Sequence, residues 1–217
     1  PTALTQARQM IADGADIIDV GGESTRPEAE PVSASDELAR VLPVVRALAE
    51  AEVLVSIDTT KAEVARACLE AGARIVNDVT GLTGDPAMAA EVARSGAGLV
   101  IMHMQGTPRT MQDQPAYGNV VEEVAAFLAG QVTAAVAAGI EPDRIVVDPG
   151  IGFGKTVDHN LALLQGLPRI ADRTGRPVLI GVSRKRFIGL ITGREVGDRL
   201  SGSLAAAAFA ISRGAQV

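Results

Sequence analysis

One local pattern recurs along the chain and constrains its fold: a short apolar run ends at a polar residue, and a helical segment follows. Residues 144–155 show the pattern clearly, because the run 144–147 is followed by Asp148 and by a glycine-spaced loop that ends at Lys155. A buried strand that stops at a carboxylate and then turns sharply is typical of ligand-binding positions in α/β proteins. The polar residues at the ends of these runs are therefore expected to matter for function.

Six such runs are predicted as strands, with helical periodicity between them. They are residues 15–20, 53–57, 74–76, 98–102, 144–147 and 177–182. Continuous apolar runs are typical of parallel strands that are covered on both faces. Strands that alternate with helices favour a parallel sheet with helical crossovers. Ser35 or Asp36 is expected to cap the helix that follows the first of these strands.

Residues 1–217 contain no composition break or linker, so a single domain is predicted. A helical pattern comes first, and residues 214–217 resemble the start of a further strand. One additional strand at each end would complete eight strand–helix units. We therefore predict an α/β fold, a (β/α)8 TIM barrel, whose first and last strands lie outside this chain. An open doubly wound sheet is the alternative, but its polar groups would gather at one switch point and not at every strand end.

Composition narrows the classes of function. The chain has 47% hydrophobic and 21% charged residues, as an ordinary globular domain does. A net charge of −6 and only 2% aromatic residues argue against nucleic-acid binding, which needs cations and stacking rings. No run approaches the roughly 18 uninterrupted apolar residues of a membrane helix. The single Cys68 forms no disulfide framework and is expected in the core, which fits a reduced, cytoplasmic setting.

Four residues at strand ends carry the chemistry of the predicted pocket: Asp58, Asn77, Asp148 and Lys185. In a parallel barrel all strand ends project from one face, so residues far apart in sequence converge there. Carboxylates accept hydrogen bonds, an amide donates and accepts, and an ammonium donates. This set suits a nitrogen-rich heterocycle. A single Asp at a strand end more simply caps a helix or starts a turn, and that explanation is preferred for Asp78.

The glycines of residues 150–154 do not form a phosphate-binding loop. A P-loop needs four residues between its first Gly and Gly-Lys, and this run has three. The Rossmann pattern fails as well, because its third Gly would fall on Lys155. The run is interpreted as a tight turn that brings backbone and Phe153 close to a ligand, with Phe153 as a wall of the pocket.

A basic cluster, residues 183–186, follows the sixth predicted strand of this acidic chain. Beside a buried strand it is expected to face an anionic ligand, and Arg26 adds a further cation. His103 and His159 are isolated in the sequence and are interpreted as structural residues.

Together these segments resemble the dihydropteroate synthase family of pterin-binding enzymes, which sulfonamides inhibit. The matching motifs are Asp19-Val-Gly-Gly-Glu-Ser-Thr25-Arg26-Pro27, Val55-Ser-Ile-Asp58-Thr, Val76-Asn77-Asp78-Val79, Met102-His-Met-Gln-Gly-Thr-Pro, Asp148-Pro-Gly-Ile-Gly-Phe153-Gly-Lys and Gly181-Val-Ser-Arg-Lys185. They follow the family's order and span almost the whole chain.

The resemblance implies a transferase that joins a dihydropterin methyl diphosphate to 4-aminobenzoate and releases diphosphate. It also implies roles for individual residues. Asp58 and Lys185 are the expected catalytic residues. The pterin would be held by Asp58, Asn77, Val79, Met102, Asp148, Gly181 and Lys185. Thr25, Pro27, Phe153 and Arg186 would bind aminobenzoate, and Thr25 and Arg26 would bind diphosphate.

The resemblance further implies Mg²⁺ as cofactor, sulfonamides as inhibitors and a homodimer. In the family, the Asn that binds Mg²⁺ would precede Pro1, so no metal ligand is expected in this chain. An anion-binding Arg and His would follow Val217. Glu28 stands where the family usually has Gly. A pterin-dependent methyltransferase and a non-catalytic pterin-binding domain are the alternative functions.

Overall fold

The computed structural model describes residues 2–25, 29–107 and 109–217. Its centre is a parallel sheet of five short strands, in the order in which they occur along the chain. They are β1 (Ile18–Gly21), β2 (Val55–Asp58), β3 (Ile75–Asp78), β4 (Gly98–Met102) and β5 (Ile145–Asp148). This confirms five of the six predicted strands and their parallel arrangement.

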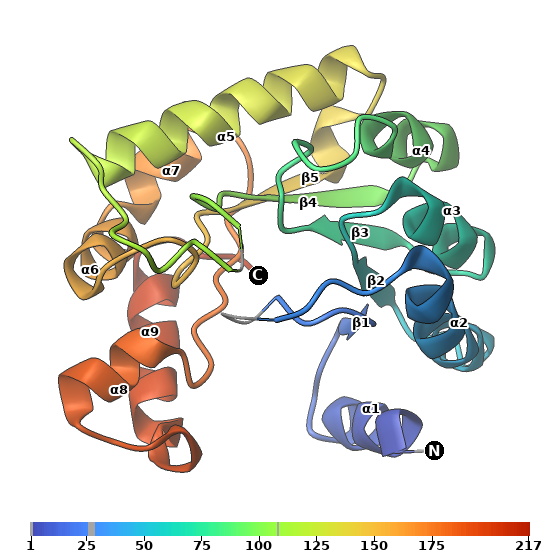
Figure 1. The fold of residues 1–217 in the computed structure, drawn as a ribbon, viewed down its shortest axis with the longest axis horizontal. Helices are drawn as coiled ribbons and strands as arrows, with labels where there is room; N and C mark the ends of the chain where they lie inside the picture. The colour runs from blue at the N-terminus through green and yellow to red at the C-terminus, as the bar shows by residue number, and fades with distance from the viewer. Residues whose placement is uncertain (1, 26–28, 108) are drawn as a thin grey trace.

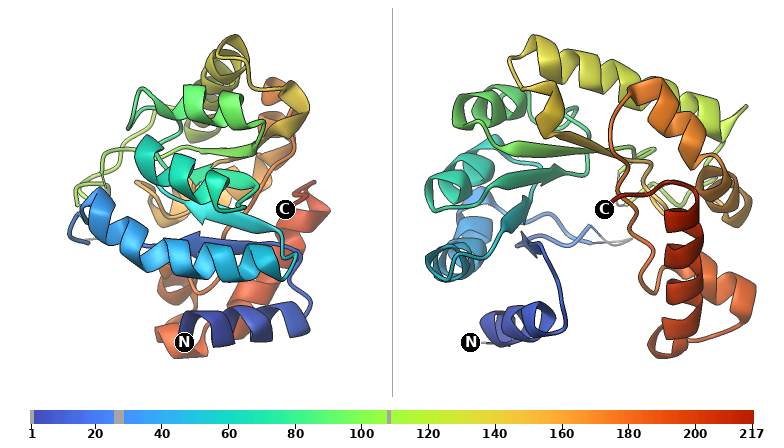
Figure 2. Two further views of the ribbon diagram at one scale, coloured as in Figure 1. Left: turned by 90° about the vertical axis from the view of Figure 1, so that its right-hand side faces the viewer. Right: turned by 180° about the vertical axis from the view of Figure 1, so that it is seen from behind.

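The helices are α1 (Thr2–Ala12), α2 (Ala34–Glu50), α3 (Ala62–Glu70), α4 (Met88–Ser95), α5 (Val120–Ala137), α6 (Val157–Gln165), α7 (Leu167–Thr174), α8 (Arg186–Thr192) and α9 (Leu200–Ser212), with short 3-10 turns η1 (Pro142–Arg144) and η2 (Val196–Asp198). Helix α1 precedes the first strand, and α2 to α5 each follow a strand and lie on the outer side of the curved sheet (Figure 1). Seen from two further directions, α2 to α5 follow one another along the sheet, and α8 and α9 lie together beyond α6 (Figure 2). The strands line the inside and the helices cover the outside, with a helix after each of the five strands, as in the wall of a (β/α) barrel.

The sixth predicted strand, residues 177–182, is not a regular strand in the structure. Val178 makes a single parallel bridge to Val147 of β5. The Leu179 N–H donates to the Val147 carbonyl at 2.9 Å, and Val147 donates to the Pro177 carbonyl at 3.0 Å. Pro177 has no N–H, so the ladder cannot extend before Val178. The segment nevertheless occupies the sixth position of the wall, and Gln216 bonds to its far side at Val178.

The core lies between the sheet and the helices. Fully buried apolar side chains from successive helices meet the strands there: Val45, Val64, Cys68, Val92 and Leu128. Cys68 is therefore a core residue, as predicted. The apolar helix α5 is long enough to cross a membrane by length and composition, but it packs on β4, α6 and α7 as an outer helix of the barrel.

The cap of α2 differs from the prediction. Ser33, and neither Ser35 nor Asp36, is its N-cap, and the Ser33 hydroxyl accepts from the Asp36 N–H at 3.2 Å. The sequence pattern was ambiguous because several capping residues lie close together in this segment.

Removing this cap provides a test of the helix start. Because an N-cap hydroxyl satisfies a backbone N–H that has no helical partner, Ser33→Ala is expected to lower the free energy of unfolding by about 1 kcal/mol. Ser35→Ala is the matched control, and it should have a smaller effect. Urea unfolding followed by circular dichroism measures both. Equal losses of unfolding free energy in the two variants would contradict the assignment of Ser33 as the N-cap of α2.

Candidate active site

A cavity of about 480 Å³ runs along the inner face of the sheet and reaches the carboxyl ends of the strands. Parallel register brings these ends level, since Gly21 pairs with Asp58, Asp58 with Asn77, and Met102 with Asp148. The predicted site residues that line the cavity are Thr25, Asp58, Asn77, Val79, Met102, Asp148, Phe153 and Gly181. The barrel geometry therefore gathers residues separated by more than a hundred positions in sequence.

Lys185 lies beside this cavity. It directly precedes α8, and its Nζ lies 4.6 Å from the centre of the Phe153 ring. The same ammonium donates to the Ile151 carbonyl. A Cβ atom on Gly181 would lie 3.6 Å from it. Lys185 and Phe153 thus form one corner of the site.

The remaining predicted residues are not in this group. Arg186, the first residue of α8, is exposed and is not among the described residues that line the cavity. Arg26, Pro27 and Glu28 lie outside the described residues.

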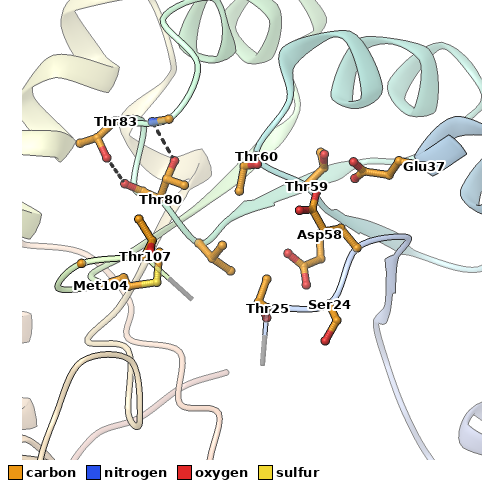
Figure 3. Close-up of a pocket in the computed structure, with 14 residues that line it drawn as sticks. Ser24, Thr25, Glu37, Asp58, Thr59, Thr60, Thr80, Thr83, Met104 and Thr107 are labelled. Atoms are coloured by element: carbon orange, nitrogen blue, oxygen red, sulfur yellow. Dashed lines mark hydrogen bonds between the residues drawn. The ribbon is translucent and has the colours of Figure 1, made fainter. Parts of the chain in front are cut away.

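A second pocket of about 330 Å³ adjoins the first and shares Thr25, Asp58 and Val79 with it. Its walls carry hydroxyl groups from several loops. In Figure 3, Ser24 and Thr25 lie next to Asp58 on the segment after β1, with the Ser24 hydroxyl directed away from the Asp58 carboxylate. Asp58 therefore lies where the two spaces meet.

The field around Asp58 is strongly negative. Burial raises the pKa of Asp58 from 3.8 to about 8, and the carboxylates of Asp19, Glu37, Asp78 and Glu23 add to the shift. Such a group holds an unusually unfavourable negative charge, which a cationic ligand or a ligand N–H would relieve.

Asp148 is buried and is held by its own turn. Its Oδ1 accepts from the Gly150 N–H at 2.7 Å, which fixes the carboxylate toward the loop. Burial raises the pKa of Asp148, while Lys185, this N–H and Lys155 act in the opposite direction. Burial likewise lowers the pKa of Lys185, against the attraction of Asp148. The two charges act on each other at one side of the site, where they offer an acceptor and a donor to a heterocycle.

Asn77 has a partner that the sequence analysis did not assign. Its Nδ2 donates to Asp19 Oδ2 at 3.0 Å. Because a carboxylate accepts and does not donate, this bond directs the amide nitrogen at Asp19 and leaves the amide oxygen available to a ligand N–H. The signal in the sequence was an Asp inside an apolar strand, with Asp19 lining the cavity from β1.

A second unassigned group lies behind Asp58. Lys61 bridges Glu23 and Glu37, with its Nζ 2.6 Å from Glu37 Oε2. Glu37 is completely buried, and its Oε1 has no hydrogen-bond partner. In Figure 3 its carboxylate reaches from α2 toward Thr59 and Asp58. No short-range sequence pattern predicts this group, because Lys61 and Glu37 belong to different loops and helices.

Two further assignments concern turns and histidines. Asp78 accepts from the Thr80 and Leu82 N–H groups at 2.9 and 2.8 Å, so it stabilises a turn, as predicted. His159 belongs to the capping box of α6 with Thr156. His103 is buried and bonded to Lys155. Among residues 2–25, 29–107 and 109–217, no three His, Cys, Asp or Glu side chains could hold a metal ion.

The fold and the site define a (β/α)-barrel enzyme that binds a polar heterocycle at its strand ends. Comparison with known proteins agrees. The sequence profile described as pterin binding enzyme matches residues 1–217. The dihydropteroate synthase of Synechocystis is 46% identical over 100% of this chain and 75% of its own length.

Solved structures are equally similar. The Xanthomonas albilineans dihydropteroate synthase with 4-aminobenzoic acid superposes with a TM-score of 0.93 at 44% identity, over 99% of this chain and 76% of that one. The Yersinia pestis dihydropteroate synthase in complex with a sulfonamide drug gives 0.94 at 41% identity, over 98% and 77%. The chain belongs to the pterin binding enzyme family, among the dihydropteroate synthases.

Proposed function

We propose that this chain catalyses the dihydropteroate synthase reaction of folate biosynthesis. The amino group of 4-aminobenzoate attacks the methylene carbon of 7,8-dihydropterin-6-ylmethyl diphosphate. The new C–N bond forms, the C–O bond to diphosphate breaks, and the amine loses one proton. The observation that carries this proposal is the convergence of Asp58, Asn77, Asp148 and Lys185 around one cavity.

These groups complement a pterin ring. The buried Asp148 carboxylate suits an amino group and a ring N–H, which are paired donors. The Asn77 oxygen, left available by Asp19, accepts a further ring N–H. Lys185 donates to a ring carbonyl or nitrogen, and Val79, Met102 and Gly181 provide apolar surface for the ring faces.

The negative field supports departure of diphosphate. As the C–O bond breaks, positive charge develops on the pterin methylene. This charge favours the ionised forms of Asp58 and Asp148, and the two carboxylates stabilise it because they are fixed in place before the reaction. The aromatic amine is neutral and attacks without a strong general base. Phe153, Thr25, Pro27 and Arg186 are proposed to bind aminobenzoate, and Thr25 and Arg26 the diphosphate.

Mg²⁺ is proposed to accompany the diphosphate. Mg²⁺ bound to phosphates keeps several waters and needs only one or two protein ligands. The described residues form no metal cluster of their own, so no step is assigned to it through this chain. Bound to the leaving group, Mg²⁺ would neutralise part of its charge.

A homodimer in the cytoplasm is also proposed. Large apolar side chains are exposed along α8 and α9, among them Leu190, Ile191, Leu204 and Ile211. Such a surface supports association, and the buried free thiol of Cys68 suits a reducing compartment. Light scattering on the full-length protein gives the mass of the assembly.

Turnover tests the proposed function directly. The full-length natural protein is expected to release diphosphate only when the pterin diphosphate, 4-aminobenzoate and Mg²⁺ are all present. Lys185→Met removes a charged donor, and kcat/KM is expected to fall by about a hundredfold. Arg194→Met, which changes an exposed cation paired with Asp198, is the matched control. Unchanged turnover in the Lys185 variant would contradict the site assignment.

A further inference from the structure

Lys155 has no role in the reaction as described, yet it is buried to 4% exposure at the end of the loop that carries Phe153. Its ammonium has three neighbours within hydrogen-bond range. These are His103 Nδ1 at 3.0 Å, the His103 carbonyl at 3.3 Å and the Phe153 carbonyl at 2.8 Å. An ammonium has three donors and no acceptor, so all of its hydrogen-bonding capacity is used inside the protein. Lys155 therefore ties the loop after β5 to the end of β4.

The loop that Lys155 holds is fixed along its whole length. Four consecutive carbonyls, those of residues 151–154, each accept a hydrogen bond from a side chain. The donors are Lys185 to Ile151, Gln112 to Gly152, Lys155 to Phe153 and Tyr117 to Gly154. In a loop without regular structure, such bonds take the place of a ladder. The ring of Phe153 is thereby set at the cavity wall.

Close backbone contact makes the Lys155 bonds hard to replace. Gly150 has a φ of +70°, and a Cβ there would lie 1.9 Å from the His103 carbonyl oxygen. The same Cβ would lie 3.3 Å from Lys155 Nζ. The loop after β5 thus crosses the segment after β4 with no side chain between their backbones. The Lys155 ammonium donates hydrogen bonds where they cross.

The position of the ammonium beside His103 is also defined. Burial lowers the pKa of His103 to about 3, with Lys155 adding to the shift, so the ring is neutral at physiological pH. When Lys155 is protonated its ammonium cannot accept, so Nδ1 of His103 accepts from it and Nε2 carries the proton. The ring is held edge-on to Phe127 at 5.0 Å. Lys155 is consequently anchored to a rigid neighbour on one side and to Phe153 on the other.

We propose that Lys155 is a positioning residue for the second substrate, holding Phe153 where the aminobenzoate ring must pack. This inference rests on the proposed function and deepens it. Lys155 does not touch the substrate. It acts through the backbone carbonyl of Phe153, the residue whose ring forms a corner of the cavity together with Lys185.

The test compares substrate constants in the full-length natural protein. Lys155→Met keeps the length of the side chain and removes all three donors. The KM for 4-aminobenzoate is expected to rise about tenfold, with the KM for the pterin diphosphate changed by less than about twofold. Tyr117→Phe is the matched control, since it removes the bond to the adjacent Gly154 carbonyl and leaves the ammonium in place. A smaller rise is expected from it.

A double-mutant cycle separates positioning from general destabilisation. If Lys155 acts through the Phe153 ring, Lys155→Met should add little to the effect of Phe153→Ala. Additive effects, equal changes in both KM values, or a lower Tm with unchanged constants would overturn the inference. If Lys155→Met does not fold, Lys155→Gln is measured in its place. If neither variant folds, Lys155 is needed for stability and the positioning role is overturned. Absence of turnover in the unaltered protein would instead overturn the proposed function.

Discussion

Asp58→Asn is expected to remove most of the activity and, at the same time, to stabilise the ligand-free protein. The carboxylate is proposed to stabilise the cation that develops on the pterin, so its loss is expected to lower kcat by about a thousandfold. The same carboxylate lies among Asp19, Glu37, Asp78 and Glu23, which repel it in the folded state. Asn has nearly the same shape and carries no charge.

The stabilisation depends on pH in a defined direction. The folded protein raises the pKa of Asp58 from 3.8 to about 8, so the folded state binds a proton that the unfolded state has lost across this range. The stability that protonated Asp58 contributes is complete below pH 3.8 and is lost as the pH rises through 8. The difference between Asp58→Asn and the unaltered protein should therefore be absent near pH 3.8 and largest above pH 8.

Urea unfolding at a series of pH values measures this difference. Because Asp58 is only half-buried and solvent screens its charge, Asp58→Asn is expected to raise the free energy of unfolding at pH 8 by only about 2 kcal/mol. Asp172→Asn, on the exposed side of α7, is the control for losing a carboxylate elsewhere. If the Asp58→Asn variant is less stable than the unaltered protein at pH 8, the Asp58 carboxylate must have a favourable partner in the folded state, and the prediction is wrong.

This opposition between activity and stability is typical of sites whose charges are arranged for a transition state. The polar residues at the strand ends are the part of the site that could be predicted from the sequence. Asp58, Asn77 and Asp148 were predicted because each directly ends an apolar strand, and parallel register then places them at the same level. Local sequence and one rule of barrel geometry were sufficient.

The supporting contacts could not be predicted in the same way. The bond from Lys155 to His103 joins residues 52 positions apart, and that from Lys61 to Glu37 joins residues 24 apart. Each depends on how a loop crosses its neighbour, which no local pattern encodes. The prediction of a sixth strand was only partly met, since an apolar run predicts burial but does not ensure a regular ladder, and here Pro177 limits the pairing to a single bridge.

The ion pair behind Asp58 is expected to matter most for folding. Lys61→Met leaves Glu37 buried without its cation and Glu23 unpaired at the edge of the pocket. Removing one partner of a buried pair leaves an uncompensated charge, and the side chain of Lys61 is only 26% exposed. The free energy of unfolding is therefore expected to fall by about 3 kcal/mol.

Arg94→Met provides a matched control. Arg94 also bridges two carboxylates, Glu70 and Glu91, but on the exposed surface of α4, where water screens the pair and little change is expected. The double variant Lys61→Met/Glu37→Gln should recover part of the loss, because the amide needs no counter-ion. If Lys61→Met unfolds no more readily than Arg94→Met, the ion pair between Lys61 and Glu37 does not stabilise the folded protein as expected.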